Sequence, residues 1–196
     1  MSKTLTIIIP SYNTSTFIDA SMRTMLENRN IDNLEIIIVD DGSKDNTAEL
    51  ARAYVEKYPQ NVRLISKANG GHGSAINVGV QEATGKYFKV IDGDDYVDTE
   101  ELAQLIDQLK CNDSDLFVSY YTTVSDTTGE ETVIGPQDWS FIPDRTKIAE
   151  NCIINSEQAL EKIYFCIHEY QVERSGLSSW TRWWSLHRCR PVLLHL

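Results

Sequence analysis

The chain has 196 residues, of which 41% are hydrophobic and 24% are charged, and its net charge at pH 7 is −11. This length is enough for one domain with a sizeable core, and the acidic balance argues against nucleic acid as a partner. The four cysteines are widely spaced and form no CxxC motif, a pattern typical of reduced thiols in a cytoplasmic protein. No apolar run approaches the roughly 20 residues of a membrane-spanning helix, and no signal peptide precedes the first apolar run.

Four short apolar runs, most of them rich in β-branched residues, alternate with amphipathic segments along the first 109 residues. They predict strands at 5–9, 34–39, 62–65 and 87–91, with Pro10 closing the first. The alternation of strands and helices predicts an α/β fold with a mostly parallel sheet, right-handed crossovers and helices on both faces. Ligands bind such sheets at the carboxyl ends of their strands.

The helices between these strands are predicted from apolar residues at helical spacing. Their boundaries are indicated by capping residues, by proline and by glycine. The first helix is expected to start at Ser15 or Thr16, the second at Asp45, the third after the loop 69–74, and the fourth at a capping box of Asp98 and Glu101. Pro59 and Gly85 are expected to end the second and third helices.

The fourth apolar run ends abruptly in the acidic motif Asp92-Gly93-Asp94-Asp95. Burying an unpaired charge is costly, so these carboxylates are expected to emerge at the edge of the sheet. Asp92 and Asp94 are two residues apart and point the same way in an extended chain, while Gly93 permits a bend. Carboxylate oxygens suit Mg²⁺ or Mn²⁺ shared with substrate phosphates. A solvated acidic turn before a helix is the alternative, and the motif alone does not decide between them.

Polar loops also follow the other three predicted strands, the first of them at Ser11-Tyr12-Asn13. Asp40-Asp41-Gly42-Ser43 is, in isolation, more typical of a turn with a helix cap than of a binding site. The glycine loop 69–74 opens a helix, so its amides and the helix dipole form a natural anion site, although it matches neither the dinucleotide fingerprint nor a P-loop. Beside it, Lys67 and His72 are more often solvated residues than phosphate ligands. Asn77 either caps neighbouring backbone or faces the cleft.

Taken together, these motifs resemble the family 2 glycosyltransferases, which have the GT-A fold of nucleotide-diphospho-sugar transferases, a Rossmann-like, mostly parallel sheet. The matching segments are 7–13, 37–45, 69–79 and 90–95, within a match of about residues 4–109. The resemblance implies an inverting, metal-dependent hexosyltransferase of cell-surface polysaccharide biosynthesis. Its donor would be a nucleotide-diphosphate sugar, with a UDP-sugar favoured, and its acceptor a glycan, a lipid-linked sugar or another hydroxyl.

By the same resemblance, Asp94 ligates Mn²⁺ or Mg²⁺ with support from Asp95. The residues that the resemblance assigns to the donor, or that adjoin its expected site, are Pro10, Tyr12, Asn13, Asp40, Asp41, Lys67, Asn69, Gly70, Gly71, Asn77, Asp92 and Gly93. Among them, Asp40 or Asp41 is expected to contact the base, and Asp92 to lie near the ribose or base. The family often has an arginine at the position of Ile76. Its donor contact is therefore absent here, or is replaced by Lys67 or His72.

The region after the acidic motif is less informative. Segments 115–124 and 131–134 predict two strands around a polar turn, and 157–166 has helical spacing. The expected organisation is a nucleotide-sugar-binding half at 1–125, a partial acceptor-side region at 126–173 and an atypical tail at 174–196. The candidates for a general base are Glu169 and Glu173, because a hydroxyl acceptor needs a carboxylate within hydrogen-bond reach.

The tail gathers four arginines and three of the four tryptophans, without an acidic residue. One interpretation is a basic aromatic surface that binds a partner or the inner face of the membrane. The other, slightly favoured, is a tail that is not the native continuation, as a frame error or truncation would leave.

Two other functions stay open at this point. One is a nucleotide-sugar-binding fragment without turnover, and the other is a sugar nucleotidyltransferase. A nucleotidyltransferase usually has a glycine-rich, basic loop after its first strand. Here that loop is Ser11-Tyr12-Asn13, without glycine or lysine, so this alternative ranks below the transferase.

Overall fold

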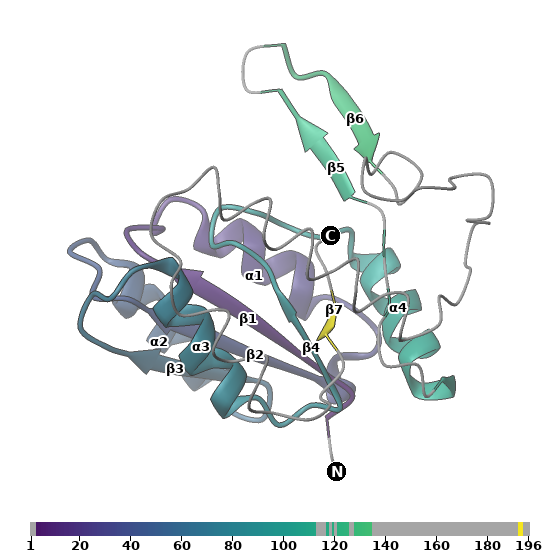
Figure 1. Ribbon diagram of the computed structural model, residues 1–196, viewed down its shortest axis with the longest axis horizontal. Helices are drawn as coiled ribbons and strands as arrows, with labels where there is room; N and C mark the ends of the chain where they lie inside the picture. The colour runs from purple at the N-terminus through teal and green to yellow at the C-terminus, as the bar shows by residue number, and fades with distance from the viewer. Residues whose placement is uncertain are drawn as a thin grey trace. The chain divides into compact units, whose positions relative to one another are not determined.

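A computed structural model describes residues 3–112, 117, 119, 121–125, 128–134 and 192–193 of the chain. The chain divides into two compact units, Met1–Asp113 and Ser114–Leu196. The first unit contains alternating strands and helices from β1 to α4, and the second contains the strands β5, β6 and β7 (Figure 1). The first unit carries the segments that resemble a nucleotide-sugar site.

A parallel sheet forms the centre of the first unit, as the four apolar runs predict. Its strands lie in the order β3-β2-β1-β4, and each neighbouring pair is parallel. Their bounds are Leu5–Ser11 for β1, Leu34–Asp40 for β2, Val62–Ser66 for β3 and Tyr87–Val90 for β4. Every residue of β1 and β2 is buried, because both faces of these central strands are covered.

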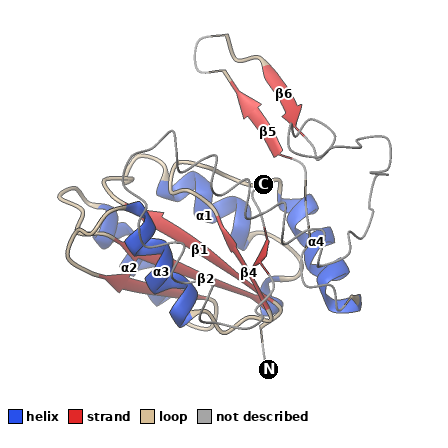
Figure 2. Ribbon diagram, viewed as in Figure 1, coloured by secondary structure: helices blue, strands red, loops and turns tan. Residues whose placement is uncertain are grey.

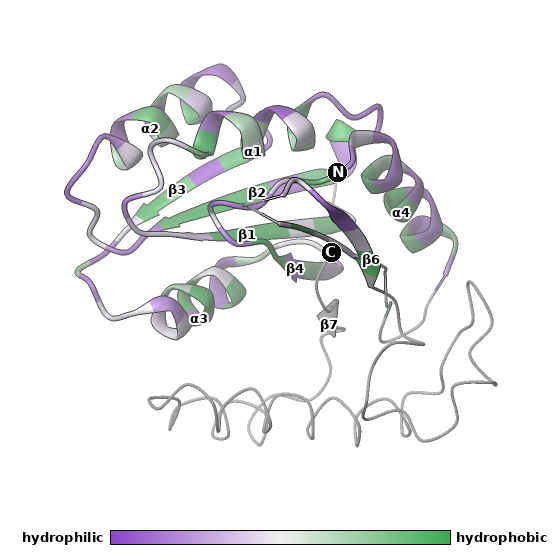
Figure 3. Ribbon diagram, turned by 90° about the horizontal axis from the view of Figure 1, so that it is seen from above, coloured by the Kyte–Doolittle hydropathy of each residue, from purple (hydrophilic) through white to green (hydrophobic). Residues whose placement is uncertain are grey.

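The helices pack on both faces of this sheet, which confirms the predicted layering. Figure 3 shows α1 and α2 over one face and α3 over the opposite face, and α4 packs against α1. Their bounds are Ile18–Leu26 for α1, Thr47–Lys57 for α2, His72–Glu82 for α3 and Thr99–Cys111 for α4, with a 3-10 turn η1 at Ile31–Asn33. The alternation of strands and helices is visible in Figure 2.

Strand β1 continues through Pro10 to Ser11, so the expectation that Pro10 closes it was wrong. The Ser11 carbonyl accepts from the Asp41 amide and the Ile8 carbonyl from the Ile91 amide. Alternate residues of β1 therefore face β2 and β4, and Pro10 faces the β4 side. Pairing with β4 ends at Ile8, so the missing N–H of proline removes no bond from the ladder.

Two helix starts also differ from the prediction. Helix α1 begins at Ile18, and its N-cap Phe17 makes no side-chain cap, whereas Ser15 or Thr16 was expected to cap it. The amide of Ser15 instead donates to the carboxylate of Asp45 at 3.1 Å, which ties this turn to the next loop. Helix α3 begins at His72, inside the segment expected to be a loop. It ends at Glu82, before Gly85. Residue 85 must be glycine because a Cβ there would lie 2.7 Å from the Thr6 amide nitrogen.

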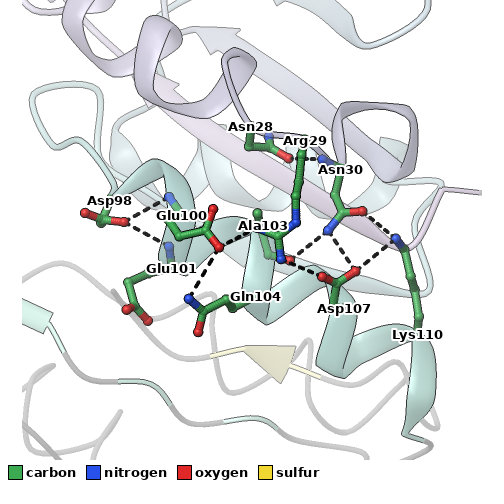
Figure 4. A network of polar contacts seen from close by, with 10 residues as sticks. All are labelled: Asn28, Arg29, Asn30, Asp98, Glu100, Glu101, Ala103, Gln104, Asp107 and Lys110. Carbon is green, nitrogen blue, oxygen red and sulfur yellow. Dashed lines mark hydrogen bonds and ion pairs between the residues drawn. The ribbon is translucent and has the colours of Figure 1, made fainter.

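The start of α4 confirms Asp98 as its cap, since the Asp98 carboxylate accepts from the Glu100 and Glu101 amides at 2.9 Å each. A polar network then holds this helix to the loop after α1 (Figure 4). Within it, Arg29 pairs with Glu100 at 2.5 Å and with Asp107 at 2.8 Å. The network fixes the helix that directly follows the acidic motif.

In the second unit, β5 at Tyr121–Val124 and β6 at Glu131–Ile134 form an antiparallel hairpin, and β7 spans Val192–Leu193. The predicted helix at 157–166 lies outside the described residues, as does nearly all of the tail. The expected boundaries after residues 125 and 173 stay predictions. None of the helices described here is long and apolar enough to cross a membrane.

Helix α3 lies very close to the sheet at Gly79. A Cβ atom added there would lie 2.3 Å from Cγ2 of Ile8, a side chain fixed in the middle of β1. Any residue larger than glycine must therefore push the helix away from the strand.

We expect Gly79→Ala to lower the free energy of unfolding by about 1–3 kcal/mol, as overpacking of a core does. Alanine ordinarily stabilises a helix by about 1 kcal/mol relative to glycine, so the sign of the change is itself the test. Urea denaturation measures it, and Ala53→Gly on the exposed face of α2 gives the propensity difference alone. A raised midpoint for Gly79→Ala would contradict this packing.

A buried carboxylate lies on β2 at the other end of the sheet from the acidic motif. Glu35 accepts from the Thr6 hydroxyl at 2.6 Å and from the Thr84 amide at 2.8 Å, and it pairs with Arg63 at 3.1 Å. Burial alone would raise the pKa of Glu35, but these donors together hold that pKa below its ordinary value of 4.5.

This depressed pKa predicts how stability varies with pH. The unfolded chain binds the proton of Glu35 more readily, so the contribution of Glu35 is complete above pH 4.5 and is lost as the pH falls toward the lower folded pKa. Glu35→Gln should flatten this acid limb of the stability curve and cost about 1–3 kcal/mol at neutral pH. Glu49→Gln on the exposed face of α2 is the control. An unchanged acid limb in Glu35→Gln would refute the assignment.

Candidate functional site

Four loops of the first unit meet in a closed circuit of contacts. Asn13 joins the loop after β1 to the loop after β2, and Asp41 joins the latter to the glycine loop before α3. His72, at the start of α3, faces Asp92 in the loop after β4. Gly93 in turn packs on the loop after β1. The predicted gathering of these loops at one edge is therefore what the structure shows.

Asn13 adopts a left-handed backbone conformation with φ of 57°. Its amide donates to the Ser43 hydroxyl at 3.0 Å, and its side-chain oxygen accepts from the Lys44 amide at 2.8 Å. Asparagine tolerates this conformation better than most residues because its short polar side chain bonds locally. These bonds give Asn13 a structural role in the site, and they leave Tyr12 beside it 45% exposed.

The carboxylate of Asp41 holds the glycine loop in place. It is 3% exposed and accepts from the Gly70 amide at 2.9 Å and the Gly71 amide at 2.7 Å. Lys67 completes the group by an ion pair with the same carboxylate, and it also donates to the Ala68 carbonyl at 2.7 Å. Burial alone would raise the pKa of Asp41, but the bonds from Lys67 and the two amides outweigh it and lower that pKa.

This arrangement revises the expected use of the glycine loop. The sequence marks its amides as a site for an anion, and the anion that two of them bind is a carboxylate of the chain itself. Gly71 is the N-cap of α3 with φ of 85°, a conformation that glycine adopts without strain. Lys67 is likewise committed to Asp41. Of the two possible replacements for the family's arginine, Lys67 is therefore occupied, whereas His72 faces Asp92.

Asp40 closes the turn that precedes α2, as its sequence context indicates. Its carboxylate is buried and accepts from the Ser43 amide at 3.0 Å. Gly42 has φ of 74°, and a Cβ there would lie 3.0 Å from the amide nitrogen of Asn69. The turn and the glycine loop therefore touch through backbone atoms.

Sequence analysis did not single out Thr14 and Thr47, which strengthen this part of the circuit. The Thr14 amide donates to the Thr47 hydroxyl at 2.9 Å, and that hydroxyl donates to Asp45 at 2.6 Å. Burial alone would raise the pKa of Asp45, but the bonds from Thr47 and Ser15 lower it strongly. The only sequence signal was an aspartate two residues before a helical threonine, which is common at helix starts.

The acidic motif forms a tight turn in which Asp94 and Asp95 have no ion-pair partner among the described residues. The Asp95 amide donates to the Asp92 carbonyl at 3.0 Å, and Asp94 is exposed. Partial burial of its carboxyl group raises the pKa of Asp95, and the negative charges of Asp92 and Asp94 raise it further. One oxygen of Asp92, Oδ1, is buried and accepts no hydrogen bond within the described part of the chain.

These features fit a divalent cation that is coordinated by the carboxylates and by the oxygens of a bound phosphate. The carboxylates are hard oxygen ligands, and after burial it is the negative charges of Asp92 and Asp94 that raise the pKa of Asp95. No three histidine, cysteine or acidic side chains among the described residues form a metal cage. A cation held by one or two carboxylates, phosphate oxygens and water needs no such cage.

The remaining candidates are placed as follows. Asn77 lies half-buried in α3, and Ile76 beside it is 5% exposed. The side chain of Ile76, where the resemblance implied an arginine, is therefore packed into the core. The candidate bases Glu169 and Glu173 lie outside the described residues and stay predictions.

Comparisons with known proteins identify a family and a fold. The family model described as "Glycosyl transferase family 2" matches residues 6–163. The uncharacterized glycosyltransferase EpsJ of Bacillus subtilis is 34% identical over 134 residues, which cover 68% of this chain and 38% of EpsJ. The chain therefore spans less than half the length of such relatives.

Two solved structures share the fold. S. aureus TarS 1–349 in complex with UDP-GlcNAc is 26% identical with a TM-score of 0.54, covering 65% of this chain and 36% of that one. The mannosyltransferase PcManGT from Pyrobaculum calidifontis, in complex with GDP-Man and Mn²⁺, is 25% identical with a TM-score of 0.54, covering 63% and 36%. Together with the family match, these likenesses confirm the predicted GT-A fold, and the chain belongs to glycosyl transferase family 2.

Proposed function

We propose that this chain carries the donor half of a metal-dependent, inverting glycosyltransferase that moves a hexose from a nucleotide-diphosphate sugar to a hydroxyl acceptor. The observation that carries the proposal is the closed circuit of four loops. Their polar groups are mostly bonded to one another, whereas the carboxylates of the acidic motif are left with uncompensated charge. Such unpaired groups at the carboxyl edge of a parallel sheet favour a binding site.

Each part of the donor finds a suitable group in this circuit. Asp94 would hold Mn²⁺ or Mg²⁺ with support from Asp95, and the cation would stabilise the charge of the diphosphate leaving group. The Asp92 side chain is 41% exposed, and its carboxylate would accept hydrogen bonds from the hydroxyls of a ribose. The half-exposed ring of Tyr12 offers a flat apolar surface to a base.

Two relatives support this choice of ligand. One was solved with UDP-GlcNAc and the other with GDP-Man and Mn²⁺. They agree on a nucleotide-diphosphate sugar and differ in the base. We propose a UDP-sugar, with a glycan or lipid-linked acceptor of cell-surface polysaccharide synthesis. The location would then be cytoplasmic, at the inner face of the membrane when the acceptor is lipid-linked.

Residues 126–173 would supply the acceptor side, with Glu169 or Glu173 as the single base that an inverting displacement requires. The chain spans 38% of a relative such as EpsJ. This fact favours a second candidate function, a nucleotide-sugar-binding portion that does not turn over by itself. Incubation with a panel of nucleotide sugars separates the two, since only the first releases nucleoside diphosphate.

Titration calorimetry with UDP, with and without Mn²⁺, tests the binding function, and Asp94→Ala tests the metal role. We expect the substitution to abolish the Mn²⁺-dependent part of the affinity. It should leave stability unchanged or slightly raised, because Asp94 is exposed and its charge repels that of Asp95.

Asp98→Ala is the matched control, four residues further along the chain. It removes the cap of α4 and should lower stability by about 0.5–2 kcal/mol without changing the affinity. Asp94→Ala behaving as this control does, with lowered stability and intact affinity, would refute the metal role. Absence of binding to any nucleoside diphosphate in the presence of Mn²⁺ would overturn the proposed function.

A further inference from the structure

His72 and Asp92 face each other across the circuit of loops. Nε2 of His72 lies 3.5 Å from Oδ1 of Asp92. This separation is longer than the 2.7–3.2 Å of a typical N–H···O hydrogen bond. Oδ1 is nevertheless buried and accepts no hydrogen bond within the described part of the chain. A buried carboxylate oxygen without a donor is costly, and the nearby imidazole is a suitable donor.

The backbone on each side of this pair is held firmly. His72 is the first residue of α3, whose N-cap Gly71 is bonded to Asp41 and whose Gly79 lies against Ile8. Gly93, next to Asp92, is packed so closely that an added Cβ would lie 3.2 Å from the Pro10 carbonyl oxygen. Small rotations of the two side chains, rather than movements of the loops, are therefore enough to form the bond.

The contact also decides how Asp92 presents its second oxygen. The Asp92 side chain is 41% exposed although Oδ1 is buried, so the exposed oxygen is Oδ2. A donor on Oδ1 fixes the rotation of the carboxylate and directs Oδ2 outward. The neighbouring cation Lys67 is bonded to Asp41, whereas the His72 side chain is 58% exposed and faces Asp92.

We propose that His72 is a positioning residue of the nucleotide-sugar site, whose Nε2–H donates to Oδ1 of Asp92 and thereby presents Oδ2 to a hydroxyl of the nucleoside. This inference rests on the proposed function and adds a residue to it. His72 acts through Asp92 and does not itself touch the phosphates. It is therefore expected to affect the binding of a nucleotide and not that of a phosphate group alone.

The test compares the binding of UDP and of inorganic pyrophosphate, each with Mn²⁺, by calorimetry. Losing a hydrogen bond to a charged group predicts that His72→Ala weakens UDP binding roughly tenfold, while His72→Gln, whose amide also donates, stays within about threefold of the unaltered chain. Pyrophosphate binding should be the same in all three proteins. Gln81→Ala, on the exposed side of the last turn of α3, is the control and should bind both ligands normally.

Two results would overturn the role of His72. One is equal UDP affinity in His72→Ala and the unaltered chain, and the other is a parallel loss of UDP and pyrophosphate binding, which would mean direct contact with phosphate. Failure of the unaltered chain to bind UDP would instead overturn the proposed function, and the role with it.

The contact itself is judged separately in the ligand-free chain, from the ring-nitrogen NMR shifts of His72 at a fixed, mildly alkaline pH. We expect Asp92→Ala to move these shifts, because it removes the acceptor of the Nε2–H bond. Identical shifts in Asp92→Ala and the unaltered chain would exclude the contact, whatever the nucleotide measurements show.

Discussion

The arrangement of the candidate site depends on the buried carboxylate of Asp41. A carboxylate that is 3% exposed is tolerated only when charged and hydrogen-bonding partners surround it, and here they are Lys67 and the amides of Gly70 and Gly71. The loop after β2 therefore reaches its position only together with the glycine loop. Because Gly71 is also the N-cap of α3, the same interaction sets where that helix begins.

The loops around Asp41 differ in how completely their polar groups are satisfied. Asn13 and Asp45 accept from backbone amides of neighbouring loops, and Asp40 accepts from an amide of its own turn. In the acidic motif, by contrast, burial and the neighbouring negative charges raise the pKa of Asp95, and Oδ1 of Asp92 is buried without a hydrogen-bond donor in the described residues. The first group builds a rigid frame, and the second holds the unbalanced charge that a ligand can neutralise. Among residues of identical chemistry, this contrast is what favours the acidic motif as the proposed ligand site.

The apolar runs predicted the four strands of the first unit correctly, because parallel strands covered on both faces read as nearly continuous apolar runs. They also predicted which loops meet at one edge. The sequence did not predict Pro10 within β1 or the start of α3 at His72, since both depend on which neighbour each backbone group faces. Nor did it predict that Asp41 binds the glycine amides, because the approach of two loops is decided by packing far from either one.

We propose that the carboxyl edge of this sheet holds a metal and a nucleotide together, beside Asp94. The decisive measurement is an anomalous difference map, recorded at the manganese edge from a crystal of the chain grown with UDP and Mn²⁺. We expect one strong peak within coordinating distance of the Asp94 carboxylate, with the diphosphate on its other side. A diphosphate bound elsewhere on the chain, or a manganese peak away from Asp94, would contradict it.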